Sequence, residues 1–354
     1  YVVLGAPVGR HGDWTVRTSL AGGERSAWTL VGEYATKTDR AHAFRTGVSY
    51  SAQTFADPAI GHSLAAIDNV RRAGGVFFTD HWTVTRALSI ESGLQIDRYD
   101  YLTDPSLVSA RLAVRHGLPG RIALVAVASP HMVAPGAAEF SAPAASGVWM
   151  PPERTFSPLD DAHGLEAQRI DEYAFGFDAP LVSARDQDAV VLRVRRFIET
   201  STNQVATIFG LNEASEVGHY YLASPGHVAV DGWMVGVTST LAPDVVASID
   251  YSRTFATWNA GATPGAAFGH ASSLVRRGTE RLHDITASVD VNVPATSTRV
   301  RLALRIDSGY SRAYQPRAVV AARYALEVRQ LLPVEIFSGG SLNVLASIRT
   351  LHRD

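Results

Sequence analysis

Apolar and polar residues alternate along much of this chain, and residues 284–308 show the pattern most clearly. The stretch reads DITASVDVNVPATSTRVRLALRIDS, so every second position from Ile285 to Val293 is apolar and Asp, Thr, Ser or Asn stand between. After residues 294–297 the alternation resumes from Val300 to Ile306, now mostly against arginines. A period of two places successive side chains on opposite faces of a strand. The stretch therefore predicts two β-strands with one aliphatic face and one charged face.

The same alternation, interrupted by turn-forming residues, predicts strands along nearly the whole chain. The predicted strands are residues 13–21, 25–36, 40–53, 74–82, 86–100, 106–115, 120–129, 168–178, 189–200, 226–240, 244–258, 281–293, 298–310, 318–331 and 342–350, with a further strand at 1–8. Residues 63–74 have the spacing of a short amphipathic helix and could form one in a loop. The predicted class is all-β, with about 15 or 16 strands.

Connections between the predicted strands alternate in length. The short ones are residues 83–85, 116–119, 179–188, 241–243, 294–297 and 332–341, and the long ones are 54–73, 130–167, 201–225, 259–280 and 311–317. An antiparallel up-and-down sheet places all short turns at one end and all long connections at the other. That arrangement is typical of outer-membrane barrels, with short periplasmic turns and long extracellular loops.

The length and the faces of the strands also favour a membrane barrel. Several predicted strands exceed the five or six residues usual in soluble proteins and suit a tilted crossing of a bilayer. In residues 244–258 the apolar face is interrupted only by Arg253, which we expect near the outer rim, where a charge is tolerated. The apolar face is therefore predicted to contact lipid and the charged face to line a wet lumen. A soluble β-sandwich or propeller with its charges in water is the alternative.

Two further features bear on this interpretation. Residues 122–128, IALVAVA, are apolar on both faces, so they are expected either to line a lumen filled by another domain or to point small alanines inward. Aromatic residues near predicted strand ends suggest girdles at the membrane interfaces. They are Trp82, Tyr99, Tyr101, Trp233, Trp258, Tyr310 and Tyr314.

Composition excludes several classes of protein. The 354 residues carry a formal charge of −2 with no basic excess, which gives no indication of nucleic-acid binding. Cysteine is absent, so disulfides and thiolate metal sites are excluded. The longest apolar run is far shorter than the roughly twenty residues of a membrane-spanning helix. The chain begins with Tyr1 and shows no leader, which suggests a mature or cropped form.

Residues 74–102 resemble TonB-dependent outer-membrane receptors. In that family a strand with an aromatic-x-x-Asp-x-Trp pattern turns and returns with Leu-x-Leu-x-x-Gly-Leu-Arg-x-Asp; here these patterns occupy residues 77–82 and 88–97, with Gln95 in place of the arginine. Residues 165–178 are similar to the family's Leu-x-x-Glu-x-x-x-x-Tyr-x-x-Gly strand entry, with Gln168 in place of the glutamate. Residues 327–354 are similar to the penultimate hairpin of such receptors. The three matches follow the order of the family's segments along the chain, and together they cover most of residues 74–354.

The resemblance implies part of a receptor barrel of about 22 strands around a plugged lumen. Residues 1–354 are expected to form a single transmembrane, up-and-down β-barrel domain in the bacterial outer membrane, without the plug domain, the coupling segment and the closing strand. The implied function is energy-coupled uptake of a scarce solute, such as a siderophore, corrinoid, glycan or peptide. Its expected partners are membrane lipid, the plug of the full-length protein and a TonB-type energy-coupling protein. A passive porin and a soluble β-rich binding module are the alternatives. An upstream plug would favour the receptor over the porin, and a signal peptide directly before Tyr1 would favour the porin.

Candidate site residues follow from the predicted faces and loops. No histidine spacing, serine elbow or phosphate loop indicates a catalytic or metal site, so we expect no enzyme activity and no cofactor. Charged residues on the predicted lumen face could dock a plug or attract an anionic ligand, and the first role is preferred. They are Arg193, Arg195, Asp250, Asp290, Arg299, Arg301 and Arg305. In the longest loop, residues 130–167, the candidate ligand contacts are Trp149, Met150 and Phe156.

Overall fold

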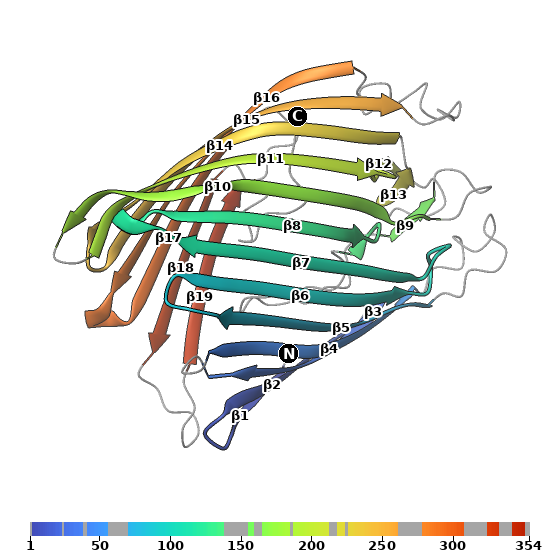
Figure 1. Ribbon diagram of the computed structural model, residues 1–354. Helices are drawn as coiled ribbons and strands as arrows, with labels where there is room; N and C mark the ends of the chain where they lie inside the picture. The colour runs from blue at the N-terminus through green and yellow to red at the C-terminus, as the bar shows by residue number, and fades with distance from the viewer. Residues whose placement is uncertain are drawn as a thin grey trace.

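Sixteen strands form one continuous antiparallel sheet in the computed structural model (Figure 1). The structure describes residues 2–22, 25–37, 41–55, 70–137, 155–158, 165–184, 187–211, 218–223, 226–260, 278–307, 324–332 and 342–350. The strands of the sheet are β1 (Val2–Val8), β2 (Gly12–Ala21), β3 (Arg25–Thr36), β4 (His42–Phe55), β5 (Val70–Thr83), β6 (Leu88–Tyr99), β7 (Ser106–Gly117), β8 (Ala123–Val133), β10 (Gln168–Ala184), β11 (Gln187–Thr202), β14 (Gly226–Ala242), β15 (Val245–Ala260), β16 (Gly278–Val293), β17 (Thr298–Asp307), β18 (Tyr324–Leu332) and β19 (Leu342–Thr350). Their order in the sheet is their order in the chain.

The up-and-down topology predicted from the sequence is confirmed. Each strand of the sheet pairs with its neighbours in the chain, so successive connections lie at opposite ends. Short turns, such as residues 243–244 between β14 and β15, lie at the left of Figure 1. Strands β9 (Thr155–Pro158), β12 (Ala206–Leu211) and β13 (Gly218–Ala223), which belong to the connections after β8 and β11, lie at the right. The sheet curls, and β17, β18 and β19 run behind the strands in front (Figure 1).

The structure corrects two details of the predicted strands and describes the predicted strand 318–331 only in part. Residues 70–74 belong to strand β5 and not to a helix, because their backbone pairs with β4 from Thr54 to Tyr50; residues 63–69 lie outside the described residues. Strand β18 begins at Tyr324, and residues 318–323 also lie outside. The long connections contain three unpredicted strands, β9, β12 and β13. These form a separate sheet in which β13 pairs antiparallel with β12 and parallel with β9.

The register separates an apolar outer face from a polar inner face. Ile249, Ala287 and Leu304 are paired across β15, β16 and β17 and mark the outer face, whereas Ser248 and Ser288 mark the inner face. On the outer face Ile249 is 51% exposed and Leu304 is 44% exposed, which is unusual for large aliphatic side chains unless lipid covers them. No helix in the described part of the chain is long and apolar enough to span a membrane.

Residues 123–128 of β8 also obey this alternation. By register, Ala123, Val125 and Val127 belong to the inner face, because they lie opposite Asp178, Gly176 and Ala174 of β10. Ala126 and Ala128 therefore lie on the outer face. The expectation that alanines point inward is wrong for these two residues, since the strand register, which is not visible in this sequence stretch, decides the face.

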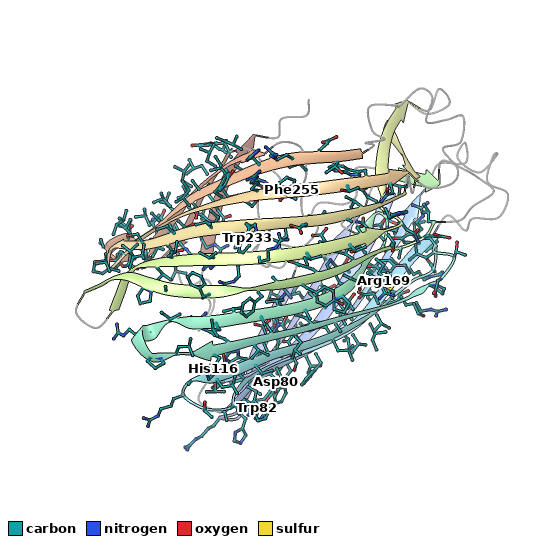
Figure 2. All side chains as sticks on the ribbon, turned by 45° about the horizontal axis from the view of Figure 1, so that its top comes forward. Asp80, Trp82, His116, Arg169, Trp233 and Phe255 are labelled. Atoms are coloured by element: carbon teal, nitrogen blue, oxygen red, sulfur yellow. The ribbon has the colours of Figure 1, made fainter. Side chains whose placement is uncertain are left out.

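The aromatic residues divide between the outer face and the interior. Trp82 and Trp233 lie exposed on the outer face, Trp82 at the short-turn end of β5, where His42 stacks on it with ring centroids 5.2 Å apart (Figure 2). Trp258 does not belong to an interfacial girdle, because it is only 7% exposed in an inner-face cluster. Tyr99 and Tyr101 pack instead against a second cluster near the long connections. Tyr310 and Tyr314 lie outside the described residues.

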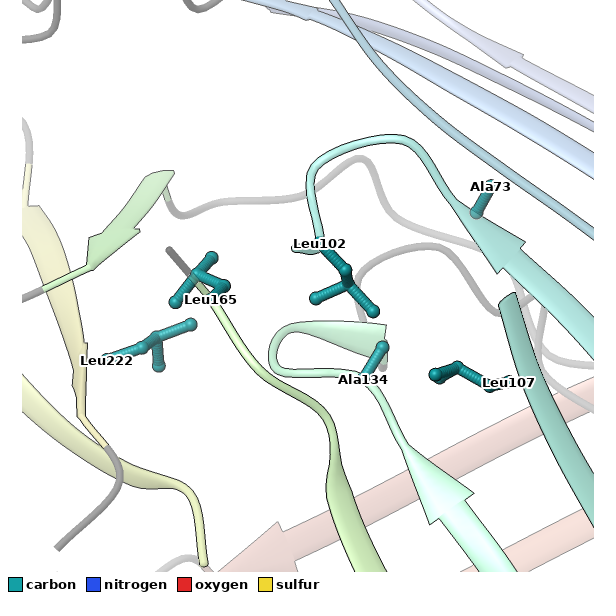
Figure 3. Packing of buried hydrophobic residues seen from close by; sticks show 6 residues of the cluster. All are labelled: Ala73, Leu102, Leu107, Ala134, Leu165 and Leu222. Carbon is teal, nitrogen blue, oxygen red and sulfur yellow. The ribbon is translucent and has the colours of Figure 1, made fainter. Parts of the chain in front are cut away.

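Hydrophobic cores occur at the long-connection end of the sheet. One cluster lies on the inner face of β11, β14, β15 and β16 and comprises Phe197, Val228, Val230, Ala256, Trp258 and Leu282. The other joins β5 and β7 to the connections, and its members are Ala73, Leu102, Leu107, Ala134, Leu165 and Leu222 (Figure 3). The sheet is therefore packed with apolar side chains mainly near its long-connection end.

Substitutions on the two faces of β16 and β17 should differ sharply in their effect. An arginine introduced as Val289→Arg or Leu304→Arg would lie on the outer face, and we expect membrane insertion to weaken by about 2–4 kcal/mol near the bilayer midplane. The controls Ser288→Ala and Arg301→Ala change the inner face and should leave assembly nearly intact. Heat-modifiable gel mobility of the membrane fraction measures the folded barrel, and equal damage by both pairs would contradict the assignment of the faces.

Candidate functional site

Ion pairs cover the inner face from one end of the sheet to the other. They join neighbouring strands or successive inward positions of one strand, as the pleat of the sheet requires. The pairs are Arg17–Glu33, Glu33–Arg45, Glu91–Arg111, Asp284–Arg305, Asp290–Arg299 and Glu327–Arg329. Both signs of charge alternate, so the inner face presents hydrogen-bond donors and acceptors without a large field of one sign.

Asp178 on β10 is the centre of the densest ion-pair network. Its carboxylate accepts hydrogen bonds from Arg115 of β7 and Arg195 of β11, each at 2.5 Å, and Arg193 approaches at 3.7 Å. The Asp178 side chain is 11% exposed and that of Arg195 is 12% exposed. One nearly buried carboxylate thus holds three guanidinium groups from two other strands, which compensates for its desolvation.

A glycine on β14 allows this network to extend farther. Arg193 Nη1 also lies 3.7 Å from Asp250 Oδ1 on β15, although β14 runs between β11 and β15. Gly236 is paired with both residues, and a Cβ at this position would collide with Asp250 Oδ1. The absent side chain at Gly236 therefore leaves the space through which the two charges meet.

The structure places all seven predicted lumen residues on the inner face. Arg193, Arg195 and Asp250 belong to the Asp178 network. On β16 and β17, Asp290 binds Arg299 at 3.2 Å and Arg305 donates to Asp284 at 2.6 Å. Their roles in docking or binding stay predictions.

Arg301 differs from the other six predicted residues. It is paired in register with Asp290 of β16 and Glu327 of β18. Each of these carboxylates forms its ion pair with another arginine, Asp290 with Arg299 and Glu327 with Arg329. The Nε of Arg301 is buried and has no hydrogen-bond partner within the described residues. This side chain is thus available to a group that the described chain does not supply.

Sequence reasoning missed Asp178 and Arg115, the centre and one arm of the densest network. Both residues stand at polar positions of predicted strands, which is the only signal the sequence offers. Their contact crosses β8, since Arg115 is on β7 and Asp178 on β10. Such a contact depends on the register of two strand pairs and cannot be deduced from periodicity.

The inner face of β4 to β8 is hollowed by a cavity of about 420 Å³. Its lining combines both charges with aromatic and sulfur-containing side chains. Among the lining residues are Arg45, Phe77, Glu91, Gln95, Asp97, Arg111, His131 and Met132. In the described ranges no three His, Cys, Asp or Glu residues come together as a metal site would require. The hollow can therefore hold polar groups of either charge.

The long connections meet in the rim cluster, the buried residues around Leu102 and Leu165 (Figure 3). The N–H of Thr103 donates to the carbonyl of Leu165 at 3.0 Å, and Leu222 of β13 packs in the same cluster. The Tyr101 hydroxyl donates to the carbonyl of Pro135 at 2.8 Å, and burial raises the pKa of this hydroxyl, which keeps it protonated as a donor. Three connections are thus fastened into one packed rim.

The predicted ligand contacts in the longest loop are only partly placed. Trp149 and Met150 lie outside the described residues. Phe156 belongs to β9, where it pairs in register with Tyr220 of β13. The structure therefore brings residue 156 to the small sheet next to the rim cluster, and it places no second predicted contact beside it.

Comparison with known proteins identifies the fold. No protein-family description and no curated protein matches the chain by sequence. Among solved structures, the siderophore receptor PirA from Pseudomonas aeruginosa matches 92% of this chain and 56% of its own, with 12% identity and a TM-score of 0.50. This chain has the barrel fold of TonB-dependent outer-membrane receptors.

Other solved structures are similar at lower TM-scores. The ferric-catecholate import receptor Fiu from E. coli K12 matches 94% of this chain and 57% of its own, with 12% identity and a TM-score of 0.49. The FrpB iron transporter from Neisseria meningitidis matches 95% and 54%, with 12% identity and a TM-score of 0.45. The chain spans little more than half the length of these receptor-fold structures. The match to PirA confirms the resemblance of residues 74–102 for the fold.

Removing the central carboxylate should destabilise the barrel. Asp178→Asn leaves three arginines without their shared negative charge, so we expect the free energy of unfolding to fall by about 3 kcal/mol. Urea unfolding of the full-length protein in lipid vesicles measures this change. Asp290→Asn is the matched control, because its partner Arg299 is 65% exposed and the loss should stay below about 1 kcal/mol. Equal losses would show that Asp178 has no special role.

Loosening the rim cluster should affect the connections and spare the barrel. Leu165→Ala removes a side chain that is 7% exposed, and we expect local stability to fall by about 2–4 kcal/mol. Hydrogen exchange at residues 206–211 and 218–223 should become faster, while heat-modifiable mobility stays unchanged. Leu181→Ala, at a position 57% exposed on β10, is the control. Unchanged exchange in the Leu165 variant would mean that the cluster does not hold the small sheet in place.

Proposed function

We propose that this chain is the barrel part of an outer-membrane receptor that imports a scarce solute with energy from a TonB-type coupling protein. The fold shared with PirA supports this proposal, and so does the sorting of short and long connections to opposite ends. PirA is a siderophore receptor. We accordingly propose that this chain belongs to a receptor and not to an enzyme. The bacterial outer membrane is the location that the exposed apolar outer face favours.

One observation favours a receptor over a passive porin: the sheet of sixteen described strands matches the siderophore receptor PirA over 92% of this chain. Within the described residues, β1 pairs only with β2 and β19 pairs only with β18. Porins close with about 16–18 strands, whereas plugged outer-membrane transporters use about 22. Because the chain covers 56% of PirA, its sixteen described strands fit one part of the larger barrel. We therefore propose that residues 1–354 form one barrel domain within a longer receptor.

The inner face suits a plug domain as its partner. Some charged side chains remain accessible there, including Arg115 at 52%, Arg45 at 57% and Arg299 at 65% exposure. A folded plug needs hydrogen-bond partners along most of the wall, and the alternating charges would supply them. Arg301 is a further candidate because its buried Nε has no partner in the described part of the chain. The seven predicted inner-face residues are accordingly proposed as plug contacts, with lipid covering the other face.

A siderophore is the solute class that the similarity to PirA favours over a corrinoid, glycan or peptide. The rim cluster supports binding at the long-connection end, because rigid rims hold contact residues in place with little loss of entropy. Residues Trp149, Met150 and Phe156 are proposed as contacts on that rim. No nucleic acid is proposed as a partner, since the formal charge is −2.

Uptake by cells that produce the full-length protein tests this function. We expect a labelled iron-loaded catecholate siderophore to accumulate, and a protonophore to abolish accumulation, because the energy comes from the inner membrane. Cells without the protein are the control. In planar bilayers the purified protein should show no steady conductance. Uptake that survives the protonophore, together with a stable open channel, would contradict the receptor and support the porin.

A further inference from the structure

A row of cationic and aromatic side chains crosses the outer face of five neighbouring strands. Phe175 of β10, Arg196 of β11, Trp233 of β14, Arg253 of β15 and His283 of β16 are paired one after another in register. Figure 2 labels Trp233 and, on the next strand, Phe255, which is two residues beyond Arg253. Three arginine or histidine side chains on a face otherwise built for lipid require an explanation.

The position of the row along the strands is the first part of that explanation. On β15 the outer face begins at the short turn with Val245, Ala247 and Ile249, all aliphatic. Tyr251, Arg253 and Phe255 follow, and Thr257 and Asn259 complete the strand toward the long connections. The order aliphatic, then cationic and aromatic, then neutral polar is the order expected where hydrocarbon gives way to headgroups. The row therefore lies at the membrane interface on the long-connection side.

Two arginines at this level share a single aromatic ring. The guanidinium carbon of Arg253 lies 5.0 Å from the centroid of Phe255, and that of Arg281 lies 5.4 Å from the same centroid. Both arginines are exposed, and neither forms an ion pair with any described residue. Two like charges held against one ring repel each other, most strongly at the edge of the low-dielectric hydrocarbon.

Neighbouring arginines on the same face, unlike Arg253 and Arg281, have acidic partners. Arg196 binds the carboxylate of Asp231 through both terminal nitrogens and also lies over Trp233, with 5.3 Å to the ring centroid. Arg169 of β10 binds Asp171 at 3.1 Å. Acidic partners therefore exist on the outer face where the fold supplies them. Arg253 in the row and Arg281 next to it bring positive charge together without such a partner among the described residues.

We propose that Arg253 and Arg281 bind a phosphate group of a lipid headgroup in the outer leaflet of the membrane. Guanidinium groups bind phosphate through paired N–H···O bonds, and one phosphate between the two arginines would remove their repulsion. Phe255 holds both guanidinium groups at the level of the headgroups. The Tyr251 hydroxyl, hydrogen-bonded to His283 Nδ1 at 2.7 Å, forms the edge of the patch on the short-turn side. This assignment rests on the proposed outer-membrane location.

A lipid phosphate fits the patch better than a free phosphate ion. Beside Tyr251 and beyond it toward the short turns, the outer face continues with Val235, Ile249 and Ile285, which are exposed aliphatic side chains. Acyl chains attached to the bound phosphate would cover these residues. A free phosphate ion has no acyl chains and would make no contact with these aliphatic residues. The apolar surface therefore adds affinity only for a lipid.

Binding of a lipid to the purified full-length protein tests this site. The probe is a glucosamine-based lipid that carries two phosphates, added to the detergent-solubilised, heat-modifiable barrel and counted by native mass spectrometry. We expect Arg253→Gln with Arg281→Gln to weaken binding about tenfold or more. Arg253→Lys with Arg281→Lys should restore part of the loss, because charge remains while the paired hydrogen bonds do not. Arg299→Gln on the inner face is the matched control and should bind like the unaltered protein.

Three results would overturn the assignment. If the same lipid without its phosphates binds equally well, the site is only an apolar surface. If the double Gln variant binds equally well, the phosphate binds elsewhere. Inorganic phosphate competing at the concentration of the lipid would show an ion site. A barrel that inserts into membranes and fails these tests disproves the lipid site alone, whereas failure of the unaltered protein to insert disproves the proposed location as well.

Discussion

Backbone hydrogen bonding between strands is the constraint on which this structure depends. Hydrocarbon offers no partner to an N–H or C=O group, so a chain that crosses a membrane without helices must pair every strand along its full length. The long antiparallel pairs satisfy this requirement; β10 and β11, for example, stay paired from residue 169 to residue 184. Such pairing fixes the register, and the register in turn divides the side chains strictly between two environments.

The charged inner face is a consequence of that division. A charge on the outer face would meet lipid, whereas on the inner face it can meet another charge on the next strand or two strands away. Arg193 and Asp250 do this across Gly236, where the absence of a side chain leaves room for the pair. The same rule explains the outer face, where His42 contacts Asp80 at 2.7 Å and Arg196 binds Asp231. Among the described residues, charges on the outer face lie near the ends of the apolar band or beside a partner.

The sequence predicts the fold well because its signal is local. Alternation over residues 284–308 requires no knowledge of distant residues, and the connection lengths show how the strands follow one another. Residues 70–74 were misread for the opposite reason, since helical spacing in a short window was overridden by their pairing with β4. The strands β9, β12 and β13 could not be predicted, because β9 gains its partner from residues 219–222.

The candidate site follows the same division between local and distant information. All seven charged residues assigned to the inner face lie there, because alternate residues of a strand point to opposite faces of the sheet. Asp178 and Arg115 escaped notice, because their contact crosses an intervening strand. The hydroxyl of Tyr101 likewise reaches Pro135 in another connection, which neither segment reveals alone.

The rim cluster has a consequence for how the outer surface can change during evolution. Loops of membrane barrels usually accept insertions one at a time, because each stands alone in water. Here Leu102, Leu165 and Leu222 come from three different connections and occupy one buried cluster. A substitution in one connection alters the space available to the other two, so acceptable changes must arrive in compensating sets. We therefore expect the three connections to change together, so that the surface at this end of the sheet is less free to vary than its length suggests.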